Sequence, residues 1–294
     1  MVQRGDSQGR RVWYCAGRKI VFDRPLVMGI LNVTPDSFTA DGLWCSGDHE
    51  RAVAHGVALA EAGADIIDVG GESTRPGAVA VSAAAEIERV VPVVEALAGR
   101  LSVPISVDTS KAAVAEAALA AGAVIINDIT ALNRVEMVEV AAATGAGVVL
   151  MHMRGTPQTM NTLAVYEDVV GEVYRFLDEA VERVVANGVA AESVVIDPGF
   201  GFAKNVEQNG ELLRELGRFR EIAPVLAGLS RKRCIGAWSG VEEPSQRIAG
   251  SVAAALLAVQ RGAAVVRVHD VRETVEGLKV QRAVESNNRD KLGI

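Results

Sequence analysis

One stretch decides the fold: Glu61-Ala-Gly-Ala-Asp-Ile-Ile67 leads the chain from a helix, through a glycine turn, into an apolar strand. The same theme returns at Ala120-Ala-Gly-Ala-Val-Ile-Ile126, Ala143-Thr-Gly-Ala-Gly-Val-Val149 and Gln260-Arg-Gly-Ala-Ala-Val-Val266. Glycine ends a helix well because it tolerates left-handed backbone angles, and the β-branched residues after it favour a strand buried on both faces. Helices and strands that alternate through such short joints indicate a parallel sheet.

Eight apolar segments fit this alternation, and each precedes an Ala-rich or amphipathic segment of helical periodicity. The strands are expected at residues 27–33, 65–71, 104–109, 123–129, 147–153, 193–199, 223–230 and 264–271. Eight such units predict an α/β fold of the closed (β/α)8 TIM barrel type; a doubly wound open sheet is the competing architecture, because strand number alone does not prove closure. The alternating stretch 12–22 predicts a β-hairpin before the first strand, in a position to plug the bottom of the barrel.

Length and composition fit one barrel. The chain has 294 residues, close to the roughly 250 that such a barrel needs, and no linker divides it, so we expect a single domain over residues 1–294. Hydrophobic residues make up 49% and charged residues 23%, which favours a large core and excludes disorder. No apolar run reaches the ~20 residues of a membrane span, and residues 1–11 lack the apolar stretch of a signal peptide. We therefore expect a cytoplasmic protein with no membrane partner.

Charge and cysteine content exclude further classes of function. The formal net charge of −7 argues against nonspecific nucleic-acid binding, so an anionic ligand must find local cations. Cys15, Cys45 and Cys234 are odd in number and far apart, which predicts neither a disulfide framework nor a structural zinc site. His49 and His55 have no Cys or carboxylate at metal-ligand spacing, so surface roles are expected.

Polar residues follow every expected strand, where the loops of a (β/α)8 barrel build its active site. These strand ends read Asn32-Val-Thr-Pro-Asp-Ser-Phe38, Gly70-Gly-Glu-Ser-Thr-Arg-Pro-Gly77, Asp108-Thr109, Asn127-Asp128, His152-Met-Arg-Gly-Thr156, Asp197-Pro-Gly199, Ser230-Arg-Lys232 and Arg267-Val-His-Asp270. Any one of them can be explained as a turn or helix cap. Helix capping does not, however, explain why cationic residues gather at the same end of the expected barrel. These residues are Arg75, Arg231, Lys232, Arg267 and His269. Cations above a carboxylate-lined floor predict a ligand with an anionic tail and a donor-rich head.

A glycine-rich run, Gly199-Phe-Gly-Phe-Ala-Lys204, lacks the full pattern of a phosphate-binding loop. We expect a glycine turn that holds Phe202 and Lys204 near the pocket.

These strand ends, together with Met28-Gly-Ile-Leu-Asn32 and Ser106-Val-Asp-Thr109, resemble the dihydropteroate synthase family. The likeness runs from about Val27 to Leu278. It implies a Mg2+-assisted condensation of 6-hydroxymethyl-7,8-dihydropterin diphosphate with 4-aminobenzoate in folate biosynthesis, with release of diphosphate. A related pterin-binding methyltransferase is less favoured, because Thr-Pro-Asp-Ser-Phe and Ser-Arg-Lys match the synthase branch.

The resemblance also implies a role for each matching residue. The pterin would be bound by Asp108, Asn127, Asp197 and Lys232, with Phe202 nearby; Mg2+ by Asn32; diphosphate by Arg267 and His269; and 4-aminobenzoate by Thr74, Arg75, Pro76 and Ser230. The catalytic group would be Asp108, Lys232, Arg267 and His269. The chemistry agrees, since a carboxylate accepts hydrogen bonds from an amino group and a ring N–H, and Mg2+ prefers oxygen ligands.

Two loops depart from the family pattern. After Asp-Ser-Phe the family usually continues Ser-Asp-Gly-Gly, whereas this chain continues Thr39-Ala-Asp-Gly-Leu-Trp-Cys45, and Thr130-Ala-Leu132 stands where Gly-rich residues are commoner. Glycine permits backbone angles closed to Leu, and a displaced closing loop lowers the rate. Two hypotheses follow: an ordinary synthase, or a diverged paralogue that binds pterin-like or aminobenzoate-like ligands, including sulfonamides and sulfones, with little or no activity. We expect binding to be preserved better than turnover.

The segment 244–262 bears on assembly, because its apolar residues occupy more of a helical circumference than one barrel contact covers. The excess predicts a C2 homodimer formed by the late helices, as the family resemblance also implies.

Overall fold

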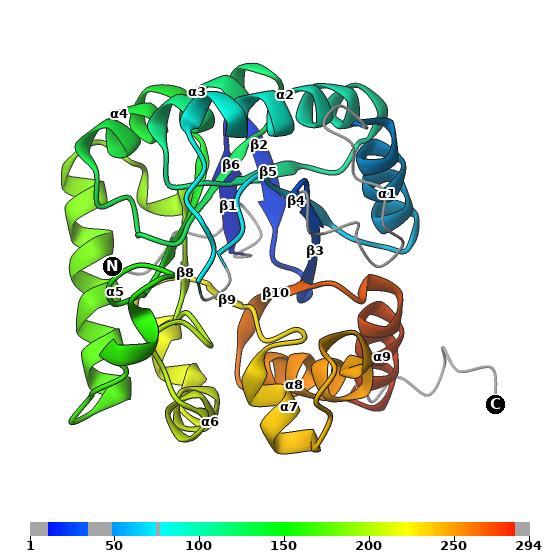
Figure 1. Ribbon diagram of the computed structural model, residues 1–294, viewed down its shortest axis with the longest axis vertical. Coiled ribbons are helices and arrows are strands. Elements are labelled where there is room, and N and C mark those ends of the chain that lie inside the picture. Colours follow the sequence, from blue (N-terminus) through cyan, green and yellow to red (C-terminus); the bar gives the residue numbers. More distant parts are fainter. Residues whose placement is uncertain (1–10, 35–48, 75–76, 286–294) are drawn as a thin grey trace.

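A computed structural model describes residues 11–34, 49–74 and 77–285, and within them eight parallel strands close into a barrel in the order β10-β3-β4-β5-β6-β7-β8-β9 (Figure 1). The strands are β3 (Leu26–Asn32), β4 (Ile66–Gly70), β5 (Ile105–Asp108), β6 (Ile125–Asp128), β7 (Gly147–Met151), β8 (Val194–Asp197), β9 (Val225–Ala227) and β10 (Ala263–Val268). Closure confirms the predicted barrel and excludes the open sheet. Most strands are two to five residues shorter than predicted and lose residues at either end, while Asn32, Asp108, Asp128 and Asp197 remain the last residues of their strands.

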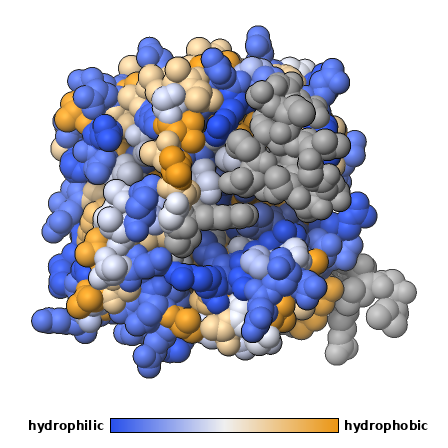
Figure 2. Space-filling view, in the orientation of Figure 1, coloured by the Kyte–Doolittle hydropathy of each residue, from blue (hydrophilic) through white to orange (hydrophobic). Residues whose placement is uncertain are grey.

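Helices ring the barrel on its outside (Figure 1). They are α1 (His49–Glu61), α2 (Ala83–Arg100), α3 (Ala112–Ala120), α4 (Val135–Thr144), α5 (Val169–Ala186), α6 (Val206–Arg214), α7 (Arg233–Ser239), α8 (Ile248–Gln260) and α9 (Val271–Glu285). Short 3-10 turns are η1 (Met160–Leu163), η2 (Ala191–Ser193), η3 (Leu216–Glu221) and η4 (Pro244–Gln246). The visible face is mainly hydrophilic, with apolar side chains in small separate patches (Figure 2). None of the helices in the described ranges is long and apolar enough to span a membrane.

The repeated glycines do what the sequence predicts. Gly63, Gly122, Gly145 and Gly262 have φ of 103°, 110°, 64° and 97°. These positive values are open to glycine at little cost, and each glycine therefore ends a helix and turns the chain into the next strand.

The bottom of the barrel is closed by the predicted hairpin, formed by β1 (Val12–Cys15) and β2 (Arg18–Val21). Trp13 is fully buried among the inward-facing strand residues, and its Nε1 donates to the carbonyl of Ser193 at 2.7 Å. A Cβ on Gly147, the first residue of β7, would lie 2.4 Å from Cys15 Sγ, so the hairpin packs tightly against the strand starts. The apolar plug leaves the opposite end of the barrel for polar chemistry.

Cys15 and Cys234 are buried free thiols, whereas Cys45 lies outside the described residues.

Candidate functional site

Arg267, near the end of β10, is the centre of a polar network inside the barrel. Its Nε donates to Asp68 Oδ2 at 2.6 Å and its Nη2 to Asp108 Oδ2 at 2.7 Å. Asn127 Nδ2 donates to the same Asp68 oxygen at 3.0 Å. Asp68 lies on β4, Asp108 on β5 and Asn127 on β6, so the network links these three strands to β10. Three predicted site residues, Arg267, Asp108 and Asn127, are thus brought together.

Burial and the neighbouring charges of this network shift the pKa values of Asp108 and Arg267. Burial raises the pKa of Asp108 to about 7, the Arg267 guanidinium opposes that rise, and the Asp68 carboxylate adds to it. Burial also lowers the pKa of Arg267, but Asp68 and Asp108 reverse the effect, and the net shift is upward. Arg267 therefore stays a cation, while Asp108 titrates near neutral pH.

Asp197 and Lys232 form the other side of the site. Asp197, the last residue of β8, accepts the N–H of Gly199 at Oδ1 (2.7 Å). A Cβ on Gly228 would lie 3.8 Å from Asp197 Oδ2 and 3.9 Å from Arg267 Cβ, which places Asp197 beside the Arg267 network. Burial raises the pKa of Asp197 against the influence of Lys232, and burial lowers the pKa of Lys232 to about 8 against that of Asp197.

The glycine turn after β8 brings Phe202 to Lys232. Lys232 Nζ donates to the carbonyl of Phe200 and lies 4.4 Å from the centroid of the Phe202 ring. A Cβ on Gly201, whose φ is 77°, would lie 2.9 Å from Lys232 Cδ, so this position needs glycine. The predicted glycine turn is confirmed.

Lys204 is buried under the same turn rather than displayed to a ligand. Its Nζ lies 2.9 Å from His152 Nδ1 and donates to the carbonyls of Gly199 and Phe202, each at 3.0 Å. Burial lowers the pKa of His152 to about 2, so the neutral imidazole can accept from the lysine. Lys204 therefore fastens the turn that carries Phe202.

Ser230, in the turn after β9, lies against His269 in the loop that follows β10. Ser230 Oγ accepts the backbone N–H of His269 at 3.2 Å and lies 3.1 Å from its Nδ1. Arg231 turns instead to Asp270, to which its Nε donates at 3.1 Å. Arg231, one of the cations predicted to face a ligand, is thus paired with a carboxylate of the chain itself, as Arg267 is.

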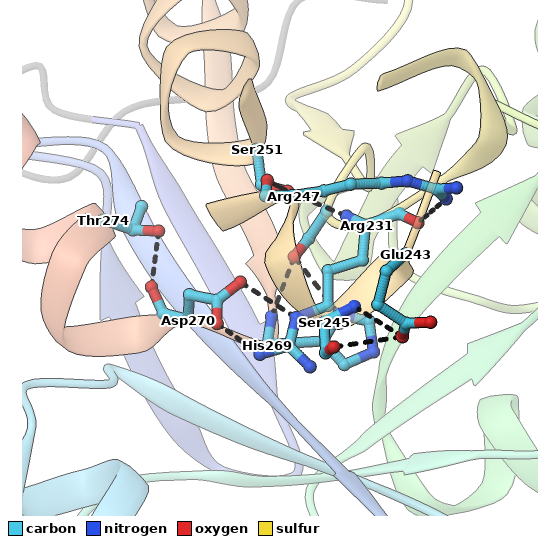
Figure 3. A network of polar contacts seen from close by, with 9 residues as sticks. Arg231, Glu243, Ser245, Arg247, Ser251, His269, Asp270 and Thr274 are labelled. Atoms are coloured by element: carbon cyan, nitrogen blue, oxygen red, sulfur yellow. Dashed lines mark hydrogen bonds and ion pairs between the residues drawn. The ribbon is translucent and has the colours of Figure 1, made fainter. Parts of the chain in front are cut away.

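Residues at the start of α8 hold the turn after β9 by hydrogen bonds to the backbone of Arg231. Arg231 has a φ of 60°, a left-handed angle unusual for a residue with a side chain. Ser251 Oγ accepts the N–H of Arg231 at 2.9 Å, and Arg247 Nη1 donates to the Arg231 carbonyl at 2.9 Å (Figure 3). These bonds hold the strained turn that carries Ser230 and Lys232.

The remaining predicted residues lie around the same opening or outside the described ranges. Asn32 ends β3; a Cβ on Gly70 would lie 3.6 Å from Asn32 Oδ1 and 3.5 Å from Asp108 Cβ, so the amide oxygen lies near Asp108. Thr74 is half-buried in the loop after β4. Arg75 and Pro76 lie outside the described residues. In the described ranges, no group of three or more His, Cys, Asp or Glu side chains could hold a metal ion.

Known proteins match this chain along nearly all of its length. A family model for pterin binding enzymes matches residues 28–269. Dihydropteroate synthase of Escherichia coli (strain K12) is 48% identical over 282 residues, which cover 95% of this chain and 98% of that protein. The chain belongs to the dihydropteroate synthase family. The predicted resemblance is thereby confirmed, and with it a dihydropteroate synthase-like protein, a transferase of folate biosynthesis.

Solved structures of dihydropteroate synthases share the fold closely. The Xanthomonas albilineans dihydropteroate synthase with 4-aminobenzoic acid has a TM-score of 0.89 and 51% identity, covering 94% of this chain and 99% of that one. The same enzyme in complex with 7,8-dihydropteroate has a TM-score of 0.84 and 49% identity, covering 92% and 98%.

One departure from the dihydropteroate synthase pattern now has a structural account. Ala131 and Leu132 have φ of 56° and 51°, the left-handed region that glycine normally occupies. The Asp128 carboxylate accepts the backbone N–H groups of Thr130 (2.8 Å) and Leu132 (2.9 Å), and Arg183 donates to the carbonyls of Ala131 and Leu132. Side-chain hydrogen bonds therefore stabilise a turn that glycine would adopt unaided. The other departure, residues 39–45, lies outside the described residues.

Sequence reasoning missed Asp68. Its position offered no reason to assign it a role, because it lies inside a strand rather than at its end. A carboxylate between Ile67 and Val69 of a strand buried on both faces was the available signal, since a buried charge needs a partner.

Proposed function

We propose that the chain catalyses the Mg2+-dependent condensation of 6-hydroxymethyl-7,8-dihydropterin diphosphate with 4-aminobenzoate. The observation that carries this proposal is the Arg267 network, in which a permanent cation is held between Asp68 and Asp108 at the opening of the barrel. Its chemistry suits a substrate with a polar ring and an anionic leaving group. The relatives that bind 4-aminobenzoic acid and 7,8-dihydropteroate support it.

The pterin ring is assigned to the floor of the site. Asp197, whose Oδ1 already accepts from Gly199, keeps Oδ2 to accept from the pterin amino group or ring N–H. Asn127 donates through Nδ2 to Asp68, which leaves Oδ1 as the acceptor for a ligand. Lys232 and Phe202 close the pocket from the side.

Departure of diphosphate is assigned to Arg267, His269 and Asp108. The bond between the methylene carbon and the diphosphate oxygen breaks, the amine nitrogen of 4-aminobenzoate attacks that carbon, and the amine then loses a proton. Arg267 and His269 stabilise the charge that develops on the diphosphate, and ionised Asp108 stabilises the cationic pterin methylene. Oriented charges of this kind typically lower a barrier by about 3 kcal/mol each.

Asn32 fits a Mg2+ ion that arrives with the diphosphate. Mg2+ usually keeps water and substrate phosphate oxygens among its ligands and needs few from the protein. The Asn32 amide oxygen near Asp108 agrees with that donor set. When bound, the cation would neutralise charge on the leaving diphosphate.

The 4-aminobenzoate is assigned to the rim formed by Thr74, Arg75, Pro76 and Ser230. Ser230 is held in place by His269, so its hydroxyl has a fixed position at the opening.

We also propose that the chain is a single domain that dimerises through its late helices. The family match over residues 28–269 supports the single domain. Helix α9 covers part of the apolar surface that predicted the dimer, because a Cβ on Gly277 would lie 3.0 Å from Val252 Cγ1 and 3.4 Å from Leu256 Cδ1. Leu257, Val280 and Val284 remain exposed on α8 and α9 and support a second contact there. The cytoplasmic location stays a prediction.

No comparison supports the alternative of a diverged chain with little activity. The test of the proposed function is diphosphate release measured with the pterin diphosphate, 4-aminobenzoate and Mg2+, each omitted in turn. We expect release to require all three and to be lost in Arg267→Met. Release that proceeds without 4-aminobenzoate would indicate a hydrolase instead.

A further inference from the structure

Lys111 lies between two carboxylates, outside the Arg267 network. Its Nζ donates to Glu72 Oε2 at 2.7 Å and to Glu86 Oε2 at 2.5 Å. Glu72 belongs to the loop after β4, Glu86 to the first turn of α2, and Lys111 immediately precedes α3. One ammonium group therefore ties together three segments that are distant in sequence.

Glu72 lies two residues before Thr74 in the loop after β4, and its two carboxylate oxygens also bind Lys111 and the segment 77–81. While its Oε2 binds Lys111, its Oε1 accepts the backbone N–H of Val81 at 2.7 Å. Farther out, Gln158 Nε2 donates to the carbonyl of Ala78 at 2.5 Å. The segment is thus held at its base by one glutamate and at its outer part by the loop after β7.

The two carboxylates differ in their freedom to move. The Glu86 side chain is 0% exposed, and its Oε1 has no hydrogen-bond partner in the part of the chain that the structure describes. Glu72 is 22% exposed and lies on a loop. Two carboxylates around one lysine repel each other, and only Glu72 can relieve that repulsion by moving toward water. If the contact to Lys111 is lost, the loop therefore moves and the helix does not.

We propose that Glu72 and Lys111 are positioning residues that set the place of Thr74 for 4-aminobenzoate and leave the pterin side of the site unchanged. The inference rests on the proposed function, which assigns Thr74 to the aminobenzoate rim. The hydrogen bonds of the pterin side are separate, because Asp108, Asn127 and Asp197 bond to Arg267, Asp68 and Gly199. Glu86 acts on Asp108 only through its charge, which raises the pKa of Asp108.

Glu72→Gln and Glu86→Gln are a matched pair, because each removes one negative charge from Lys111 and only the first alters the loop. For Glu72→Gln we expect KM for 4-aminobenzoate and Kd for a sulfonamide to rise about tenfold, with KM for the pterin diphosphate within about twofold of wild type. For Glu86→Gln we expect all three constants within about twofold of wild type. A purely structural role predicts the reverse order, since Glu86 is the more deeply buried.

Lys111 gives a second comparison. Lys111→Arg keeps the charge and can reach both carboxylates, so it should retain most of the sulfonamide affinity that Lys111→Met loses.

Hydrogen exchange at the amide of Val81 tests the loop without any ligand. Exchange should be faster in Glu72→Gln than in Glu86→Gln, because only the former weakens the acceptor of that amide. Equal exchange in the two variants, or an equal rise of KM for both substrates, would overturn the inference. If the wild-type chain forms no dihydropteroate, the proposed function fails, and the exchange experiment still decides whether Glu72 holds the loop.

Discussion

Asp68→Asn tests whether the Arg267 network acts as one unit. Asn keeps the size of the side chain but removes the charge that Arg267 Nε and Asn127 Nδ2 share at Oδ2. Breaking a buried ion pair costs about 3–5 kcal/mol when one charge is left alone, and a hydrogen bond to a charged group contributes about 1.5–3 kcal/mol. Arg267 keeps Asp108 at 2.7 Å, so its charge is not orphaned. We therefore expect a loss near the lower figures, about 2 kcal/mol.

Two assays measure this change. Urea denaturation should show the free energy of unfolding lowered by about 2 kcal/mol, and calorimetry should show a pterin analogue bound about tenfold more weakly, because Asn127 loses the group that orients it. Asp65→Asn is the matched control three residues earlier, at a partly exposed pair with Arg24. It should change stability by at most about 1 kcal/mol and leave affinity unchanged. A loss under about 0.5 kcal/mol in Asp68→Asn, with wild-type affinity, would refute the reasoning.

Three further predictions concern the pocket floor, its ionisation and the assembly. Asp197→Ala should keep the circular dichroism of the wild type but lose roughly 1.5–3 kcal/mol of pterin-analogue binding by calorimetry, and equal affinity would show that the pocket is wrongly assigned. Because Asp108 acts as an anion, with a pKa of about 7, and Lys232 acts as a cation, with a pKa of about 8, kcat/KM should rise with pH through about 7 and fall above about 8. A profile flat across both values would count against these assignments. Light scattering at micromolar concentration should give the mass of a dimer, and a monomer would contradict the interface proposed on α8 and α9.

Much of the fold follows from local residue chemistry. The four glycines of the repeated theme end helices with positive φ, and the apolar segments after them become barrel strands. Backbone preference and hydrophobic patterning act over a few residues, so one sequence reveals them. The polar residues at the barrel opening could also be predicted, because residues at the carboxyl ends of parallel strands meet at one end of a barrel.

The pairing of residues that are distant in the chain could not be predicted from the sequence. Arg231 was counted among the cations facing a ligand, but Asp270 pairs with it. Lys204 was expected near the pocket, but its partners there, His152 and the carbonyls of Gly199 and Phe202, were not predicted. Which carboxylate or carbonyl satisfies each cation depends on the register and tilt of the strands, and a single sequence does not specify these. Asp68 was overlooked because it lies inside a strand, and its partner Arg267 lies 199 residues later in the chain.

The most direct test of the account is the identity and rate of the product formed from the pterin diphosphate, 4-aminobenzoate and Mg2+. We predict that the wild-type chain forms 7,8-dihydropteroate, detected by mass spectrometry, and that Asp108→Asn forms it at least about a hundredfold more slowly because the methylene cation loses its stabilising charge. A folded wild-type chain that binds a sulfonamide but forms no dihydropteroate would contradict the proposed catalysis and favour the diverged paralogue.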